Sequence, residues 1–213
     1  MNKKTMKRAV LKILWPLLYQ TKSHLISRLG YSGIGSILML HRVCPAYGGI
    51  RIQGNSGLEV TPEYLEKTIQ YLMKENYEFV SMDTVYDRLQ RECGGRKFIA
   101  FTFDDGYADN LTYAYPILKK YNVPFIIYVA TNYPDGQLTP WWYPLEEVVL
   151  KNDRLEFEKD GKHHKFDCRS LPEKETVFHN IRALLMGGPQ ANLLSRIQKF
   201  FSFFDVDLRE TAQ

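Results

Sequence analysis

Phe98-Ile-Ala-Phe-Thr-Phe-Asp-Asp-Gly106 is the stretch of this sequence that decides the fold. Its continuous apolar run predicts a strand buried on both faces, as in a parallel sheet. Neighbouring residues on a strand point to opposite faces, but the backbone turns where a strand ends. Gly106 permits such a turn, so the carboxylates of Asp104 and Asp105 can reach one cleft.

Strand and helix patterns alternate on both sides of this stretch. Short apolar runs predict further strands over 36–40, 78–80 and 123–130. Helices are expected from Thr61-Pro62-Glu63 onward, over about 82–90 and over about 108–121. Strand–helix–strand units of this length predict an α/β fold with a parallel sheet, whose chemistry lies at the carboxyl ends of the strands.

The pattern changes after Thr131. A helix over about 144–151 is followed by two strands that flank Lys159-Asp-Gly161, a β-hairpin turn signal. Two more helices are predicted, over about 172–186 and 189–204. We therefore expect three parts: a basic amino-terminal segment (1–32), a sheet region (33–136) and an inserted α+β region (137–213).

Composition excludes several classes of protein. The 213 residues are 45% hydrophobic and 24% charged, which excludes a disordered chain. Residues 1–30 hold seven basic and no acidic groups, so the rest of the chain, with 21 basic and 24 acidic residues, carries −3 of the total +4. This balance disfavours a nucleic-acid-binding domain. The three cysteines form no C-x-x-C pair, which favours a reducing compartment, and we predict a cytoplasmic protein.

The basic amino-terminal segment leaves three interpretations open. Residues 9–19 are apolar and flanked by positive charge, with Trp15 and Tyr19 among them. Such a segment suits peripheral contact, through residues 1–29, with the inner face of an anionic membrane. It could equally be a leading helix packed on the body, or an atypical signal, although Lys12 and Pro16 interrupt the apolar run.

Two adjacent carboxylates at a strand end suit a division of labour in which one binds a cation and the other takes a proton from water. The plainer alternative is that Asp104 and Asp105 form a helix N-cap and a solvated turn. A Mg²⁺ site for a nucleotide sugar, as in a glycosyltransferase, is a third interpretation of the same pair.

The wider pattern closely resembles the polysaccharide deacetylase family, the NodB-type enzymes of carbohydrate esterase family 4. The resemblance rests on Thr102-Phe-Asp-Asp-Gly106, on Val123-Pro-Phe-Ile-Ile-Tyr-Val-Ala-Thr131, on Ile37-Leu-Met-Leu-His-Arg-Val43 and on Trp141-Trp142 before a helix. It covers roughly residues 33–150. It implies a (β/α) barrel, partial in this chain, in which a divalent metal, expected to be zinc, assists the hydrolysis of N-acetyl groups, a non-peptide carbon–nitrogen bond. By that motif Asp104 would be the catalytic base and Asp105 a metal ligand, and the partner would be a polysaccharide or a lipid-linked glycan.

The sequence departs from the family pattern at the histidines. The family's His-[Ser/Thr]-x-x-His motif, which supplies two more metal ligands, does not occur here. The five histidines are His24, His41, His163, His164 and His179. We therefore expect a chain truncated before this motif, with weak metal affinity and little or no hydrolysis. The alternative is a non-catalytic carbohydrate-binding relative at the membrane.

Four further residues are weaker candidates for contact with substrate. His41 follows a predicted strand at its carboxyl end and could line the cleft, although a lone histidine is more often structural. Tyr107 follows the carboxylates directly. Trp141 and Trp142 could stack on a sugar ring or simply pack the inserted region. Because half a barrel leaves sheet edges and one face uncovered, we also expect marginal stability or self-association.

Overall fold

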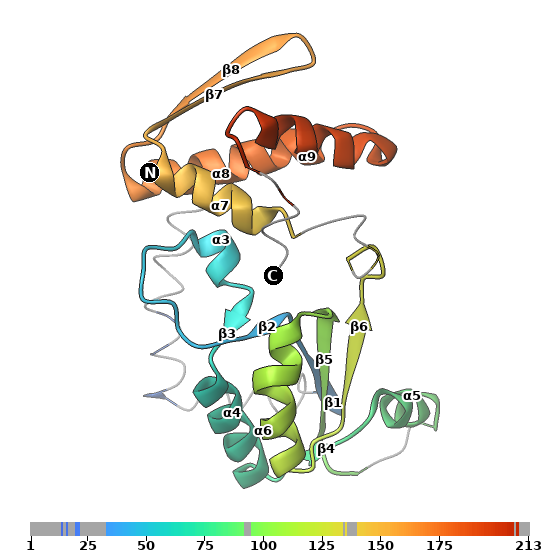
Figure 1. Ribbon diagram of the computed structural model, residues 1–213. Coiled ribbons are helices and arrows are strands. Elements are labelled where there is room, and N and C mark those ends of the chain that lie inside the picture. The colour runs from blue at the N-terminus through green and yellow to red at the C-terminus, as the bar shows by residue number, and fades with distance from the viewer. Residues whose placement is uncertain are drawn as a thin grey trace.

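A computed structural model of the chain gives the fold. It describes residues 33–91, 95–133 and 140–206, together with positions 14, 16, 20, 21, 135 and 208. The predicted amino-terminal segment (1–32) therefore lies almost wholly outside the described residues. In Figure 1 the described part consists of a sheet with its helices and, above it, a helical region that carries a hairpin.

The sheet is parallel throughout. Its strands are β1 (Gly35–Leu40), β4 (Glu78–Phe79), β5 (Phe98–Asp105) and β6 (Phe125–Val129). Phe98 pairs with a residue of β1 and a residue of β4, and Phe101 pairs with β1 and β6. Strand β1 therefore lies on one edge of β5, whereas β4 and β6 share the other edge. The predicted parallel α/β sheet is confirmed, but the strand pairings of the described residues do not show a barrel.

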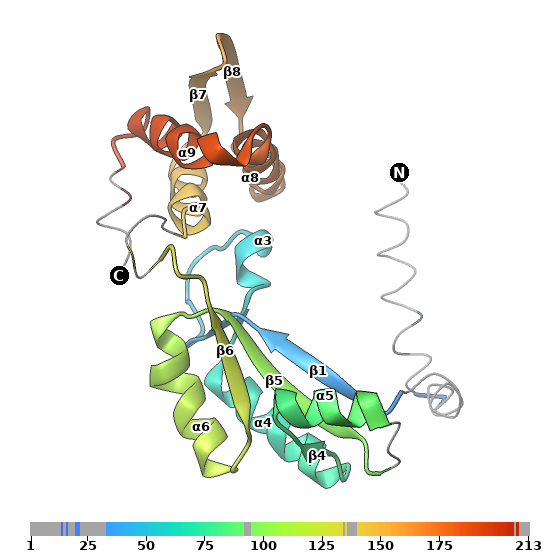
Figure 2. The same ribbon diagram turned by 90° about the vertical axis from the view of Figure 1, so that its right-hand side faces the viewer.

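Two helices cover one face of this sheet, as Figure 2 shows. They are α4 (Pro62–Lys74) and α6 (Tyr115–Lys120). Alternate residues of β5 are buried together with apolar side chains of these helices: Ile99, Phe101, Phe103, Leu65, Ile69 and Leu118. On the opposite face, α5 (Met82–Arg91) covers only the start of β5, where Val85 joins a small cluster with Phe98 and Ala100.

The helix expected over 108–121 is interrupted. It begins as a π-helical turn, η1 (Asn110–Ala114), and continues as α6. Pro116 explains the wider turn, because it has no N–H to donate to the carbonyl of Thr112 and its ring would clash with that carbonyl in an α-helix. The turn lies directly after the two carboxylates of β5.

The second half of the chain forms helices and a hairpin, as expected. Its elements are α7 (Trp142–Lys151), β7 (Arg154–Lys159), β8 (Lys162–Asp167), α8 (Leu171–Met186), η2 (Gln190–Asn192) and α9 (Leu193–Ser202). Strands β7 and β8 are antiparallel. The hairpin turn has positive φ at Asp160 (53°) and Gly161 (71°), as the Asp-Gly signal predicts.

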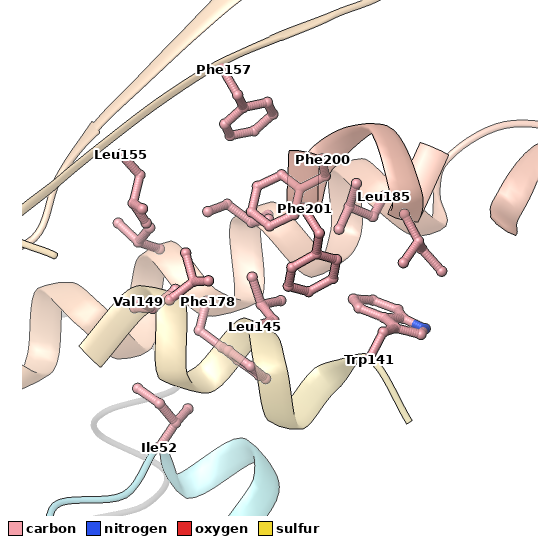
Figure 3. Packing of buried hydrophobic residues seen from close by; sticks show 14 of the residues in the cluster. Ile52, Trp141, Leu145, Val149, Leu155, Phe157, Phe178, Leu185, Phe200 and Phe201 are labelled. Atoms are coloured by element: carbon pink, nitrogen blue, oxygen red, sulfur yellow. The ribbon is translucent and has the colours of Figure 1, made fainter. Parts of the chain in front are cut away.

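This helical region has its own hydrophobic cluster, drawn in Figure 3. Leu145 and Val149 of α7 meet Phe178 of α8, Phe157 of β7 and aromatic residues of α9. Ile52 joins the cluster from the first half of the chain, just before α3 (Gln53–Ser56). The small parallel pair of β2 (Arg42–Val43) and β3 (Glu59–Val60) flanks this loop. The carboxyl end of β5 therefore points toward the place where the sheet meets the helical region.

Candidate functional site

The carboxyl end of β5 turns sharply at Asp105 and Gly106. Both residues have a positive φ, 73° and 77° respectively. Aspartate is among the few residues that tolerate this left-handed conformation, and glycine adopts it without strain. A Cβ atom on Gly106 would also lie 3.1 Å from Val129 on β6. The turn therefore needs the Asp-Gly pair that the sequence places there, and it ends strand β5 at Asp105.

The two carboxylates and His41 share one electrostatic environment. Burial raises the pKa of Asp105, the positive character of His41 opposes that shift, and the neighbouring Asp104 adds to it. Both aspartates are half-buried, as is His41. The structure therefore places His41 beside Asp105, at the end of the neighbouring strand β1. Its role toward a substrate stays a prediction.

An ion pair fastens this turn to the end of β1. Arg42 donates from Nε to Oδ2 of Asp109 over 2.6 Å, and the backbone N–H of Val43 donates to Oδ1 of Asp109 over 3.4 Å. The guanidinium carbon of Arg42 lies 5.0 Å from the ring centre of Tyr107 and 4.9 Å from that of Tyr143. Burial disfavours the charge on Arg42, but its contacts with Tyr143 and Asp109 raise its pKa overall.

Polar atoms without a hydrogen-bond partner gather around Asp105. The buried hydroxyl of Tyr107 has none among the described residues. Asn110 donates from Nδ2 to the carbonyl of His41 over 3.1 Å, but its own Oδ1 is buried without a partner in the same part of the chain. Burial, reinforced by Asp105, raises the pKa of Tyr133 to about 12, and burial likewise raises the pKa of Tyr107. Both phenols therefore stay protonated at neutral pH, as hydrogen-bond donors beside a carboxylate.

The two tryptophans differ in exposure. Trp141 is only 3% exposed and belongs to the core of the helical region, which agrees with the packing alternative. Trp142 is half-buried, and its ring meets those of Tyr133 and Tyr143 at centre distances of 6.4 Å. Its indole N–H is buried without a partner among the described residues. Of the pair, Trp142 lies closer to the aromatic side chains around the carboxylates.

The described residues do not make up a complete metal site. Nowhere among them do three histidine, cysteine, aspartate or glutamate side chains lie together in a way that could hold an ion. His163 and His164 lie on strand β8, where the first is exposed and the second stacks on Phe157. His179 is exposed on α8. Asp105 thus has His41 nearby, but this part of the chain does not supply the further ligands that a metal would need.

Sequence reasoning missed the residues that hold the site together. Asp109 is buried only four residues after Asp105, and Tyr143 reaches Arg42 from the helical region. The one signal was the position of Arg42, directly after a strand end. A long-range pair between residues 67 positions apart leaves no periodic trace in a sequence.

Known proteins share the segment that contains the carboxylate turn. Residues 91–170 match the family model described as polysaccharide deacetylase. This segment is similar to the polysaccharide deacetylases. The matched residues include the Asp104-Asp105-Gly106 turn and α7, so the resemblance seen in the sequence is confirmed for this part of the chain.

Individual proteins similar to this chain are matched over only part of their length. YxkH of Bacillus subtilis (strain 168), itself only provisionally assigned as a polysaccharide deacetylase, is 33% identical over 94 residues, which is 44% of this chain and 30% of YxkH. The Streptococcus pyogenes deacetylase PplD, solved in complex with acetate, is 29% identical, with 48% of this chain and 45% of PplD covered and a TM-score of 0.41. IcaB from Ammonifex degensii is 27% identical, with 46% and 39% covered and a TM-score of 0.39. The chain therefore spans less than half the length of these relatives.

Proposed function

We propose that this chain contributes to the hydrolysis of N-acetyl groups on a glycan, with Asp104 as the base. The observation that carries the proposal is the turn at the end of β5, which presents two adjacent half-buried carboxylates beside His41. The family match over 91–170 supports the choice of reaction class. In such a reaction a water attacks the amide carbonyl, and acetate and a free amine leave.

Each group near the turn has a part in this proposal. Asp104 would accept the proton of the attacking water, a step that general bases accelerate about 10²–10⁴-fold. The protonated phenol of Tyr133 would donate a hydrogen bond to an oxygen of the substrate. These roles need only residues at or just after the carboxyl ends of β5 and β6.

A divalent metal, with zinc as our expectation, would polarise the amide carbonyl when bound. Asp105 would supply one ligand, but the described residues do not complete the set. We therefore derive no step through the metal, and we expect this chain to bind zinc weakly and to turn over slowly. The (β/α) barrel that the family resemblance implies, partial in this chain, belongs to the same proposal.

The test is acetate release from tri-N-acetylchitotriose by the full chain with added zinc. We expect slow release that falls to background in Asp104→Asn, because the amide cannot accept the proton. Asp160→Asn is the matched control, since Asp160 lies in the exposed hairpin turn and should leave release unchanged. Release that persists in Asp104→Asn would contradict the proposal.

The alternative function is glycan binding without hydrolysis at a membrane. Binding of the trisaccharide with no acetate release by any variant would support it. The expected contact of residues 1–29 with the inner face of a membrane falls outside the described residues and stays a prediction, as does a cytoplasmic location. Among the residues that the structure describes, no helix is both long enough and apolar enough to cross a bilayer.

A further inference from the structure

A cavity lies near the carboxylate turn and is lined by other residues. Its volume is about 330 Å³, in the range of small-molecule sites. It opens between the 44–51 loop and α7, and its walls include Arg42, Tyr47, Ile50, Arg51, Tyr143 and Glu146. Neither of the two aspartates at the end of β5, nor His41, lines it. We call it the loop cavity.

The charged groups that line the loop cavity are paired, and together they carry a net charge of −1, from two arginines and three glutamates. Arg51 donates from Nη1 and Nη2 to both carboxylate oxygens of Glu59 over 2.9 and 2.8 Å. Its Nε atom donates to Glu146 over 2.9 Å. The second arginine of the cavity, Arg42, faces Glu59 at 3.9 Å and is paired with Asp109. The lining thus holds two guanidinium groups and three carboxylates, the third of which, Glu147, pairs with Lys151 outside the lining.

This network fixes the walls of the cavity. Glu146 is only 3% exposed, and its Oε1 also accepts the backbone N–H of Ile52 over 2.6 Å. Its Oε2 accepts Nδ2 of Asn55 over 2.8 Å. The carboxylate therefore ties α7 to the loop before α3, so the cavity is bounded by groups held in place before any ligand arrives. Pre-positioned polar groups lower the entropic loss of binding.

The mouth of the loop cavity is apolar and aromatic. Tyr47 and Ile50, which both line the cavity, are each 68% exposed. The guanidinium carbon of Arg51 lies 5.3 Å from the ring centre of Tyr47 and so holds the ring beside the cavity. A flat, exposed ring next to fixed hydrogen-bonding groups suits a ligand with one apolar face and a polar edge.

We propose that the loop cavity is a subsite for a neutral sugar ring of the glycan. A sugar presents C–H groups on one face, which can stack on Tyr47, and hydroxyls at its edge, which can bond to the carboxylates and guanidinium groups. Because the lining holds one more carboxylate than guanidinium groups, a polyanion is disfavoured, and because these charged groups are already paired, a polycation gains little from entering. Arg42 and Tyr143 line this cavity and also contact Tyr107, so the subsite adjoins the carboxylate turn. The choice of a sugar rests on the proposed function; the location does not.

Titration calorimetry of the full chain with tri-N-acetylchitotriose tests the subsite without requiring turnover. Tyr47→Ala should weaken binding about fivefold, the effect of losing one stacking contact. Tyr47→Phe keeps the ring and should retain binding. Tyr86→Ala is the matched control, because Tyr86 is 64% exposed on α5, away from the cavity, and should not change the affinity. A sulfated trisaccharide should bind more weakly than the neutral one.

The outcomes separate the subsite from the proposed function. Binding that Asp105→Asn abolishes and Tyr47→Ala leaves intact would overturn the subsite and leave the deacetylase proposal standing. Loss of acetate release in Asp104→Asn with Tyr47-dependent binding would support both. No binding of the neutral trisaccharide, or tighter binding of the sulfated one, would overturn the subsite.

Discussion

The Nε atom of Arg42 lies 2.6 Å from Oδ2 of Asp109 and joins the ends of two neighbouring strands. Arg42 follows β1 and Asp109 follows β5, and the Tyr143 ring from α7 lies against the same guanidinium group. The pair therefore connects three parts of the chain at the turn that carries Asp105. Because Asp109 is only 8% exposed, loss of this partner would leave a buried carboxylate without its cation.

Removing the arginine should destabilise the protein. Arg42→Gln leaves the Asp109 carboxylate buried without its cation, and we expect a loss of about 2–3 kcal/mol in the free energy of unfolding, measured by urea denaturation. Arg154→Gln is the control, because the Arg154–Asp167 pair is exposed and should contribute less than about 1 kcal/mol. Equal losses for the two variants would contradict the structural role of the pair.

The close contact at Gly106 should distinguish it from another glycine of the same conformation. Gly161 also has a positive φ, but a Cβ atom there would meet nothing within 4 Å. We expect Gly161→Ala to cost about 1 kcal/mol from backbone strain alone. Gly106→Ala should cost about 1–2 kcal/mol more, because the methyl group would crowd Val129. Thermal denaturation compares the two variants, and equal costs would show that Val129 yields freely.

Lys174 should be an essential cap for α7. Its Nζ atom donates to the carbonyls of Val149, Leu150 and Asn152 over 3.0, 3.1 and 2.7 Å, and the residue is only 8% exposed. These carbonyls at the end of the helix lack other intrahelical donors. Lys174→Met should therefore lower the free energy of unfolding by about 2–3 kcal/mol in urea denaturation.

The control for the cap is Lys151→Met, in the last turn of the same helix. Lys151 is exposed and pairs with Glu147 at the surface, so its loss should cost less than about 0.5 kcal/mol. A Lys174→Met variant as stable as this control would exclude the cap as a source of stability.

The open face of the sheet should promote self-association. Beyond the part that α5 covers, Ile37 and Met39 of β1 and Ile126 and Tyr128 of β6 are exposed on it. Contiguous exposed apolar surface and free strand edges favour contacts between chains. We expect concentration-dependent association in sedimentation velocity, and Met39→Lys should reduce it.

The matched control for the open face is Met73→Lys. Met73 is 50% exposed, similar to Met39 at 57%, but it lies on the outer helix α4. This variant should associate as the unmodified chain does. A monomeric unmodified chain at all concentrations would contradict the expectation.

Local sequence determined the elements of this protein. Apolar runs predicted the parallel strands, and Thr61 caps α4 as expected, accepting the N–H of Tyr64 over 3.2 Å. The Asp-Gly pair at 160–161 specified the hairpin turn, and the deacetylase motif around Asp104 is a contiguous stretch of the chain. These features depend on residues that are neighbours along the chain, whose conformational preferences act locally.

Tertiary structure alone decided what surrounds the carboxylates. The Arg42–Asp109 pair and the Arg51–Glu146 contact join residues 67 and 95 positions apart. Their partners are chosen by the packing of the helical region against the sheet, which no local pattern encodes. The same packing buries Trp141 in the core of the helical region, where it cannot stack on a sugar ring. Charges and aromatic rings acquire their function from neighbours, and neighbours distant in sequence are fixed only when the chain has folded.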